Sequence, residues 1–200
     1  MGAEFPGSAT RARVGDRIPR REHTRSRGGK PESMTPTIRE ATASDADAIV
    51  AVLIASKMGS FPQLIDDHDR DVSFWTNRWR SYLTIGSRAQ MSRGDGFALI
   101  ALADGKPIGF AAYHHTTRHG TDAELESLYI LPEAQGLGLG TRLLRLVATR
   151  LQTDGSRSMC VGYDHRNPYR GFYLKHGAVE INPHWAWWRE IRSLTDQTFD

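Results

Sequence analysis

One segment, residues 123–151, constrains the fold more than any other part of the chain. It predicts a strand, a glycine-rich turn and an amphipathic helix in direct succession. The strand, AELESLYIL at 123–131, is stopped by Pro132, which has no N–H to donate to a neighbouring strand. The turn QGLGLG occupies 135–140, and the helix after it carries one apolar stripe: Leu139, Leu143, Leu146, Val147 and Leu151. A strand that leads directly into such a helix indicates an α/β fold.

Further elements are predicted on both sides of this segment. Before it we expect a strand at 37–42, helices at about 44–57 and 67–85, and antiparallel strands at 97–103 and 108–115. After it we expect a strand at 158–164, a short helix at 167–176 ended by Gly177, and strands at 178–181 and 185–192. Together they predict a mixed, mostly antiparallel sheet of about six to seven strands with helices on both faces.

The first 33 residues differ in composition from the rest. They hold eight basic and four acidic side chains and, besides Met1, only six apolar ones. These are too few to offset the entropy of ordering the segment, so we predict a disordered basic tail at 1–33. Met34 is then the natural start of a domain at 34–200, and the tail an upstream extension. That domain carries a net charge of −1. Nucleic-acid binding is therefore not favoured, except as an alternative role for the tail.

Cysteine content and hydropathy limit the cellular compartment and the membrane association that we expect for the protein. Cys160 is the single cysteine, so an internal disulfide is excluded and a reducing cytoplasm is the expected compartment. No run of 18 apolar residues is present, so we expect no membrane partner.

The glycine-rich turn suits a phosphate ligand. Its glycines let the backbone approach a ligand closely, and the first N–H groups of the following helix are unpaired donors at the positive end of the helix dipole. The turn lacks the G-x-G-x-x-G spacing of dinucleotide sites, and Gly140-Thr141-Arg142 lacks the lysine of a P-loop. A plain strand-to-helix connection is the alternative that the glycines alone leave open.

Two linked motifs resemble those of the GNAT superfamily of N-acetyltransferases. ELESLYILPEAQGLGLGTRLL matches the acetyl-CoA motif Q/R-x-x-G-x-G/A after a strand that ends in proline. NPYRGFYLKHGA at 167–178 resembles the second signature, N-x-x-A-x-x-F-Y-x-K-x-G-F, with one residue fewer between the Asn and the Phe-Tyr pair and with Gly171 and Ala178 as departures at packing positions. The resemblance covers about four fifths of the chain and implies the GNAT fold and acetyl transfer to a primary amine of a small molecule or peptide.

The resemblance also implies roles for individual residues. The backbone of Leu128, Tyr129 and Ile130 would pair with the pantetheine arm of acetyl-CoA, and Asn167 would contact the cofactor near that arm. Tyr173 matches the tyrosine that protonates the departing thiolate. The pyrophosphate would be held by the residues of the turn and the helix start: Gln135, Gly136, Leu137, Gly138, Leu139, Gly140 and Thr141.

A base must deprotonate the amine, and the strand at 123–131 offers two carboxylates. An alkylamine of pKa near 10 is on the order of one part in a thousand neutral at pH 7, a handicap of roughly 4 kcal/mol. Glu124 aligns with the family's base and Glu126 is the second candidate. Strand alternation places both on one face together with Leu128. Exposed strand carboxylates without a catalytic role are the alternative.

Other residues carry weaker signals. His114, His115 and His119 lack ligand spacing and are predicted to be solvent-facing loop histidines, so we expect no metal. Trp185 and Trp187 should share a face of the last strand, as core or as a wall of the acceptor pocket. The acidic residues at 66–71 indicate a solvated helix start, or a surface that attracts a cationic amine.

The function remains open in two respects at the level of sequence. A noncatalytic acyl-CoA-binding module of the same fold, which uses the glycine-rich turn as a sensor, is the alternative to an enzyme. Dimers are common among its members, so the resemblance also allows a homodimer.

Overall fold

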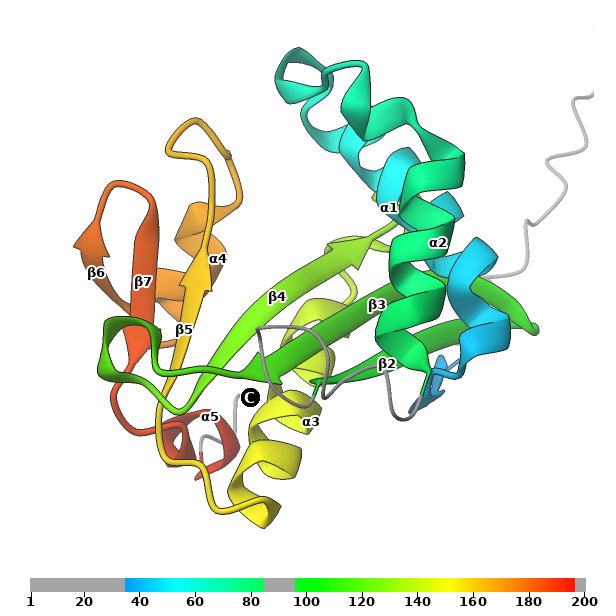
Figure 1. Ribbon diagram of the computed structural model, residues 1–200. Helices are drawn as coiled ribbons and strands as arrows, with labels where there is room; N and C mark the ends of the chain where they lie inside the picture. The colour runs from blue at the N-terminus through cyan, green and yellow to red at the C-terminus, as the bar shows by residue number, and fades with distance from the viewer. Residues whose placement is uncertain (1–34, 85–95, 197–200) are drawn as a thin grey trace, which may run out of the picture. The chain divides into compact units, whose positions relative to one another are not determined.

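The computed structural model describes residues 35–84 and 96–196. They form one seven-stranded sheet with helices on both faces (Figure 1). The helices are α1 (Ala46–Ser60), α2 (Val72–Leu83), α3 (Leu139–Thr153), α4 (Arg170–Lys175) and α5 (Arg192–Asp196). The strands are β1 (Thr37–Glu40), β2 (Gly96–Ala103), β3 (Lys106–His115), β4 (Ala123–Ile130), β5 (Met159–Gly162), β6 (Val179–Asn182) and β7 (Trp185–Trp188). The prediction for the tail at 1–33 lies outside the described residues.

The strand order is β1-β2-β3-β4-β5-β7-β6, and every neighbouring pair is antiparallel except β4 and β5. The β2–β3 hairpin turns through Asp104 and Gly105, both at positive φ, as an Asp-Gly turn requires. The predicted fold class is therefore confirmed: an α/β fold with a mostly antiparallel sheet.

Each face of the sheet has its own core. One core lies under α3 and α5 and contains Leu143, Val147 and Trp188. The other lies under α1 and α2 and contains Ile49 and Trp79. Two-sided coverage explains why the middle strands are almost wholly apolar, because both faces of β2 and β3 are buried.

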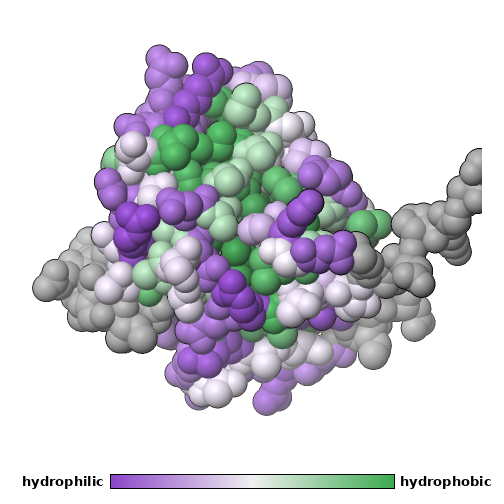
Figure 2. Space-filling view, turned by 90° about the vertical axis from the view of Figure 1, so that its right-hand side faces the viewer, coloured by the Kyte–Doolittle hydropathy of each residue, from purple (hydrophilic) through white to green (hydrophobic). Residues whose placement is uncertain are grey.

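The helix pair α1 and α2 leaves part of its own apolar surface in solvent. Met58 and Val72 are 53% and 56% exposed. With Val50, Ala51 and Ile54 they line a shallow groove between the two helices. Apolar residues form a band across this side of the molecule in Figure 2. No helix of the described residues is long and apolar enough to cross a membrane.

Helix α2 begins later than its predicted start near residue 67. The chain first makes a separate 3₁₀ turn at His68–Arg70, and Asp71 then caps the helix by accepting a hydrogen bond from the backbone N–H of Phe74 at 2.9 Å. An aspartate in the cap position fixes a helix start more strongly than the apolar periodicity does. The predicted end at Ile85 lies outside the described residues.

A β-bulge in β4 corrects the predicted strand alternation. Leu125 pairs with Tyr113 and Ser127 pairs with Ala112, so Glu126 is an extra residue without an opposite partner in β3. Leu125 and Leu128 therefore both pack toward α3, whereas Tyr129 packs toward α1. The prediction that Leu128 shares a face with Glu124 and Glu126 is wrong.

The chain end also differs from prediction. Strand β7 stops at Trp188, and the segment predicted as strand up to Arg192 instead turns into α5. The turn is held by the backbone N–H of Ile191, which donates to the carbonyl of Arg157 at 2.8 Å. Trp188, not Trp185 or Trp187, is the tryptophan of this strand that enters the core.

Candidate active site

The candidate site lies where β4 and β5 part. Their parallel pairing covers only Ala123–Met159, Glu124–Cys160 and Leu125–Val161. Beyond these pairs the two strands diverge, as Figure 1 shows, and a cavity of about 700 Å³ opens between them. Its walls come from β4, β5, the end of α1, the start of α3 and the segment around α4.

The free edge of β4 forms one wall. Leu128, Tyr129 and Ile130 line the cavity, and on their other side they pair with Ala111, Phe110 and Gly109 of β3. No β5 residue continues the ladder past Leu125. This stretch of strand is therefore open to pairing with an extended ligand, because a strand edge offers a row of backbone donors and acceptors.

The glycine-rich turn brings backbone to the cavity. Gly136 and Gly138 have φ of 75° and 77°, a left-handed conformation that favours glycine, and Gly138 is the N-cap of α3. The first intrahelical bond runs from the N–H of Arg142 to the carbonyl of Gly138, so the preceding N–H groups have no acceptor within the helix. A Cβ at Gly140 would lie 3.2 Å from Ile130 Cδ1, which shows how closely α3 approaches β4.

Seven residues of this turn and helix start carry the phosphate-site prediction, and six of them line the cavity. Leu137 does not, and its side chain is 79% exposed. The Gln135 side-chain amide is already engaged, since Nε2 donates to Ser60 Oγ at 3.0 Å and to the carbonyl of Ile130 at 2.9 Å. Gln135 thus fixes the turn against β4 and α1.

The wall formed by α4 is tied to α3. Thr141 Oγ1 and His176 Nε2 lie 2.9 Å apart in a hydrogen bond that joins the first turn of α3 to the end of α4. Asn167 lines the cavity, and its Oδ1 accepts a hydrogen bond from the backbone N–H of Tyr169 at 2.8 Å. The second sequence motif therefore folds onto the same cavity as the first.

Tyr173 projects into this cavity from α4. Burial raises the pKa of its hydroxyl to about 12, with a smaller contribution from neighbouring Tyr163. Tyr173 is thus protonated throughout the neutral range and can act as a hydrogen-bond donor.

The two candidate bases occupy different places. Glu126 lines the cavity, and its Oε1 accepts a hydrogen bond from Arg78 Nη2 at 2.6 Å. Glu124 does not line the cavity; its Oε2 lies 3.1 Å from Arg118 Nε in an ion pair. Both carboxylates are largely buried, with side chains 10% and 11% exposed, so neither is the exposed strand carboxylate of the alternative interpretation.

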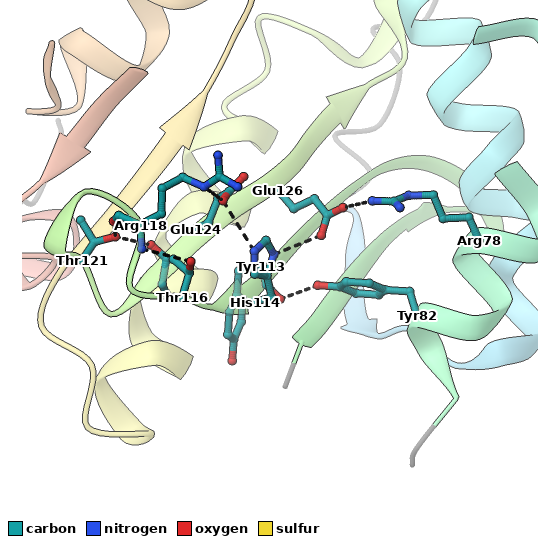
Figure 3. A network of polar contacts seen from close by, with 10 residues as sticks. Arg78, Tyr82, Tyr113, His114, Thr116, Arg118, Thr121, Glu124 and Glu126 are labelled. Carbon is teal, nitrogen blue, oxygen red and sulfur yellow. Dashed lines mark hydrogen bonds and ion pairs between the residues drawn. The ribbon is translucent and has the colours of Figure 1, made fainter. Parts of the chain in front are cut away.

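His114 is a residue of this region that sequence reasoning missed. The prediction of a solvent-facing loop histidine is wrong for it: it lies in β3 and is 1% exposed. Its ring sits between Glu124 and Glu126 (Figure 3). The signal available in the sequence was the position of His114 at the end of an apolar strand. No cluster of potential metal ligands occurs within 35–84 and 96–196.

The acidic residues at 66–71 and the tryptophans Trp185 and Trp187, which the sequence offered as weaker functional candidates, do not line the cavity. Asp69 is bonded to Lys57, which itself lines the cavity, so its charge is compensated within the protein. Trp185 packs under the β3–β4 loop, with the Arg118 guanidinium 4.7 Å from the ring centroid and the His119 ring at 4.8 Å. Neither Trp185 nor Trp187 lines the cavity.

The fold and the cavity define an α/β protein in which an open strand edge and the start of a helix face one cavity. The sequence profile of the Acetyltransferase (GNAT) family matches residues 61–178. This chain therefore belongs to the GNAT acetyltransferase family. No curated protein matches it.

Solved structures are similar in fold. PaiA N-acetyltransferase from Thermoplasma acidophilum in complex with coenzyme A is 21% identical with a TM-score of 0.61, over 77% of this chain and 98% of that one. A GNAT family acetyltransferase from Brucella melitensis in complex with acetyl-CoA is 21% identical with a TM-score of 0.53, over 78% and 88%. An acetyltransferase of the GNAT family from Staphylococcus aureus Mu50 is 17% identical with a TM-score of 0.61, over 78% and 99%.

Proposed function

We propose that this protein transfers the acetyl group of acetyl-CoA directly to a primary amine of a small molecule or peptide, with both substrates bound together. The observation that carries the proposal is that one cavity contains an open strand edge, a helix start with unpaired N–H groups, a carboxylate and a protonated tyrosine. The first two features fit the extended pantetheine arm and the pyrophosphate, and the last two fit proton transfer.

In this proposal the chain holds acetyl-CoA along its backbone. Leu128, Tyr129 and Ile130 pair with the pantetheine amides at the free edge of β4. The pyrophosphate meets the N–H groups at the start of α3, where the helix dipole favours negative charge. Asn167 contacts the arm from the other wall of the cavity.

Glu126 is our choice for the base, because it lines the cavity whereas Glu124 does not. The bound thioester supplies an activated acetyl group. Glu126 takes the proton of the attacking amine, the carbon–nitrogen bond forms as the carbon–sulfur bond breaks, and Tyr173 donates a hydrogen bond and proton to the departing sulfur.

Calorimetric titration of the full chain with acetyl-CoA, with CoA as the control, tests the cofactor site. We expect one site per chain with a dissociation constant on the order of micromolar, about −8 kcal/mol. Absence of binding would overturn the proposal. A screen for thiol release with spermidine, kanamycin and L-lysine amide then tests transfer, and binding without turnover of any amine would instead support the sensor alternative.

We also propose the cytoplasm as the compartment. Cys160 is buried, and burial raises the pKa of its thiol, so the lone cysteine is kept in the unreactive thiol form. A homodimer stays a prediction, which light scattering on the purified protein would test.

A further inference from the structure

The strongest unexplained feature of the molecule is a line of five charged or titratable side chains across β3 and β4 (Figure 3). His114 is at its centre, with Nδ1 3.1 Å from Glu126 Oε2 and Nε2 3.6 Å from Glu124 Oε2. Arg78 of α2 binds the outer oxygen of Glu126, and Arg118 of the β3–β4 loop pairs with Glu124. The line therefore runs from α2 to the β3–β4 loop, and Glu126 is its member that lines the cavity.

These five side chains can bind one more proton. The two guanidiniums balance the two carboxylates, so a neutral imidazole leaves the line without net charge. A neutral imidazole has one N–H and one lone pair, and the lone pair then faces a carboxylate whichever tautomer forms. An added proton gives both ring nitrogens a hydrogen to donate, one toward each carboxylate.

Two further titratable side chains of the described residues lie beside this line. The Tyr82 hydroxyl of α2 donates to the backbone carbonyl of Tyr113. Cys160 of β5 stands opposite Glu124 in the sheet, and burial raises the pKa of its thiol. The proton capacity of the line therefore rests on the imidazole and its two carboxylates.

We propose that His114 is the residue that holds the proton removed from the acceptor amine. The inference rests on the proposed function. Glu126 accepts the proton from the ammonium nitrogen and passes it to the lone pair on Nδ1 of His114, whose neutral ring carries its hydrogen on Nε2. The N–H bond of the ammonium breaks and a second N–H bond forms on the ring. Glu126 is then a carboxylate again, and the imidazolium lies between two negative groups. The proton leaves through Glu126 once the product has left the cavity.

The relay provides a proton acceptor whose ordinary pKa is closer to that of the ammonium group than the ordinary pKa of glutamate is. An ordinary glutamate has a pKa near 4.3 and an alkylammonium one near 10.4, so the carboxylate alone is a weak acceptor. An imidazole, with an ordinary pKa near 6.5, binds a proton on the order of 100-fold more tightly. His114 acts through Glu126 and is therefore a positioning and relay residue, which touches neither substrate.

The test is the pH profile of His114→Gln beside that of His115→Gln. His115 is the next residue of the same strand, and its side chain lies on the opposite face against Tyr113. With acetyl-CoA and the amine found by the screen, we expect wild type and His115→Gln to lose kcat/KM as pH falls through about 6 to 7. His114→Gln should lose this limb and about 10- to 100-fold in kcat, with acetyl-CoA affinity kept. Retention of the limb and of kcat would overturn the relay.

A second readout needs no acceptor. Histidine-selective ¹⁵N labelling of the full chain, with and without CoA, follows the charge of each ring, and the His114 signal is the one missing from His114→Asn. We expect the charge of that ring to respond to pH over the range in which histidine side chains in general titrate, about pH 8 to 5. A ring that keeps one charge state over this range would overturn the relay. Failure of the proposed function looks different, because then the wild type acetylates no amine whatever the ring does.

Discussion

The rings of Tyr163 and Tyr173 stack in parallel, with centroids 5.9 Å apart and planes 6° from each other. Tyr163 follows β5 and Tyr173 lies on α4, so the stack joins the β5 wall of the cavity to the α4 wall. It holds the Tyr173 ring in place from one side. The Trp188 ring packs against the Tyr173 ring from another side, with ring centroids 6.1 Å apart. A hydroxyl on a ring fixed in this way is suited to meet one atom of a bound ligand.

Tyr173→Phe should lower kcat by about 100-fold with acetyl-CoA affinity nearly unchanged, because the ring stays and only the proton donor is removed. Tyr163→Phe is the matched control, since it removes a hydroxyl from the other ring of the stack, and it should keep normal turnover. Steady-state kinetics and calorimetry on both variants give the comparison. Normal kcat in Tyr173→Phe would refute the assigned role.

Glu126→Gln should cost about 10²- to 10⁴-fold in kcat, the usual range for loss of a general base. The amide still accepts the hydrogen bond from Arg78, so the fold should be kept. Glu124→Gln, on the far side of His114, should cost less, because that carboxylate does not reach the cavity. A larger loss in Glu124→Gln than in Glu126→Gln would reverse our assignment of the base.

Gly138→Ala should weaken acetyl-CoA binding by about tenfold, or 1.4 kcal/mol, because the left-handed N-cap of α3 cannot take a side chain without strain. Gly105→Ala is the control: Gly105 has φ of 74° and, like Gly138, has no atom within 4 Å of an added Cβ. Both variants should lose about 1 kcal/mol of stability. Only Gly138→Ala should lose affinity in calorimetry, and equal affinities would argue against a phosphate site at this turn.

Asp45 should stabilise the fold only above the acidic range. Arg39 donates to it at 2.7 and 2.8 Å and the Thr42 backbone N–H at 2.8 Å, and these bonds hold the pKa of its carboxyl well below the ordinary value. Since the folded-state pKa is lowered, the stabilisation is present above about pH 4 and is lost as pH falls through the folded pKa.

Asp45→Asn should therefore cost about 1 to 3 kcal/mol in urea unfolding at pH 7 and progressively less as the pH falls below about 4. Asp47→Asn is the control, because Asp47 is 74% exposed and its ion pair with Arg80 is long at 3.5 Å. A cost for Asp45→Asn that does not change between neutral and acidic pH would contradict the linkage.

Much of the fold follows from local sequence patterns. The sheet, the glycine-rich turn and both signature motifs were predictable because apolar periodicity, Pro132 and the glycines act within a few residues of chain. The start of α2 was missed because an apolar stripe cannot show which of several aspartates becomes the cap. Trp188 and α5 were missed because the end of β7 is set by a backbone bond to Arg157, far away in sequence.

The site was harder to predict than the fold. The position of His114 at the end of an apolar strand is a weak sign of burial, because the next residues form a loop. Its contacts with Glu124 and Glu126 of β4 are made by residues that lie ten and twelve positions further along the chain. The preference for Glu124 over Glu126 came from alignment alone. In the structure Glu126 lines the cavity and Glu124 does not. This difference arises because β4 and β5 stop pairing beyond Leu125.

Because β4 contains the bulge at Glu126, the candidate site depends on the pairing register of this strand with β3. If the same residues paired with β3 without the bulge, regular alternation would make every side chain beyond Glu126 exchange faces. Tyr129 would then point toward α3 and Leu128 toward α1, and the backbone groups at the free edge would shift by one position against the start of α3. A one-residue slip of this strand against β3 would therefore disable the site as a point substitution of one side chain could not, even though every residue type required by the two sequence motifs would still be present.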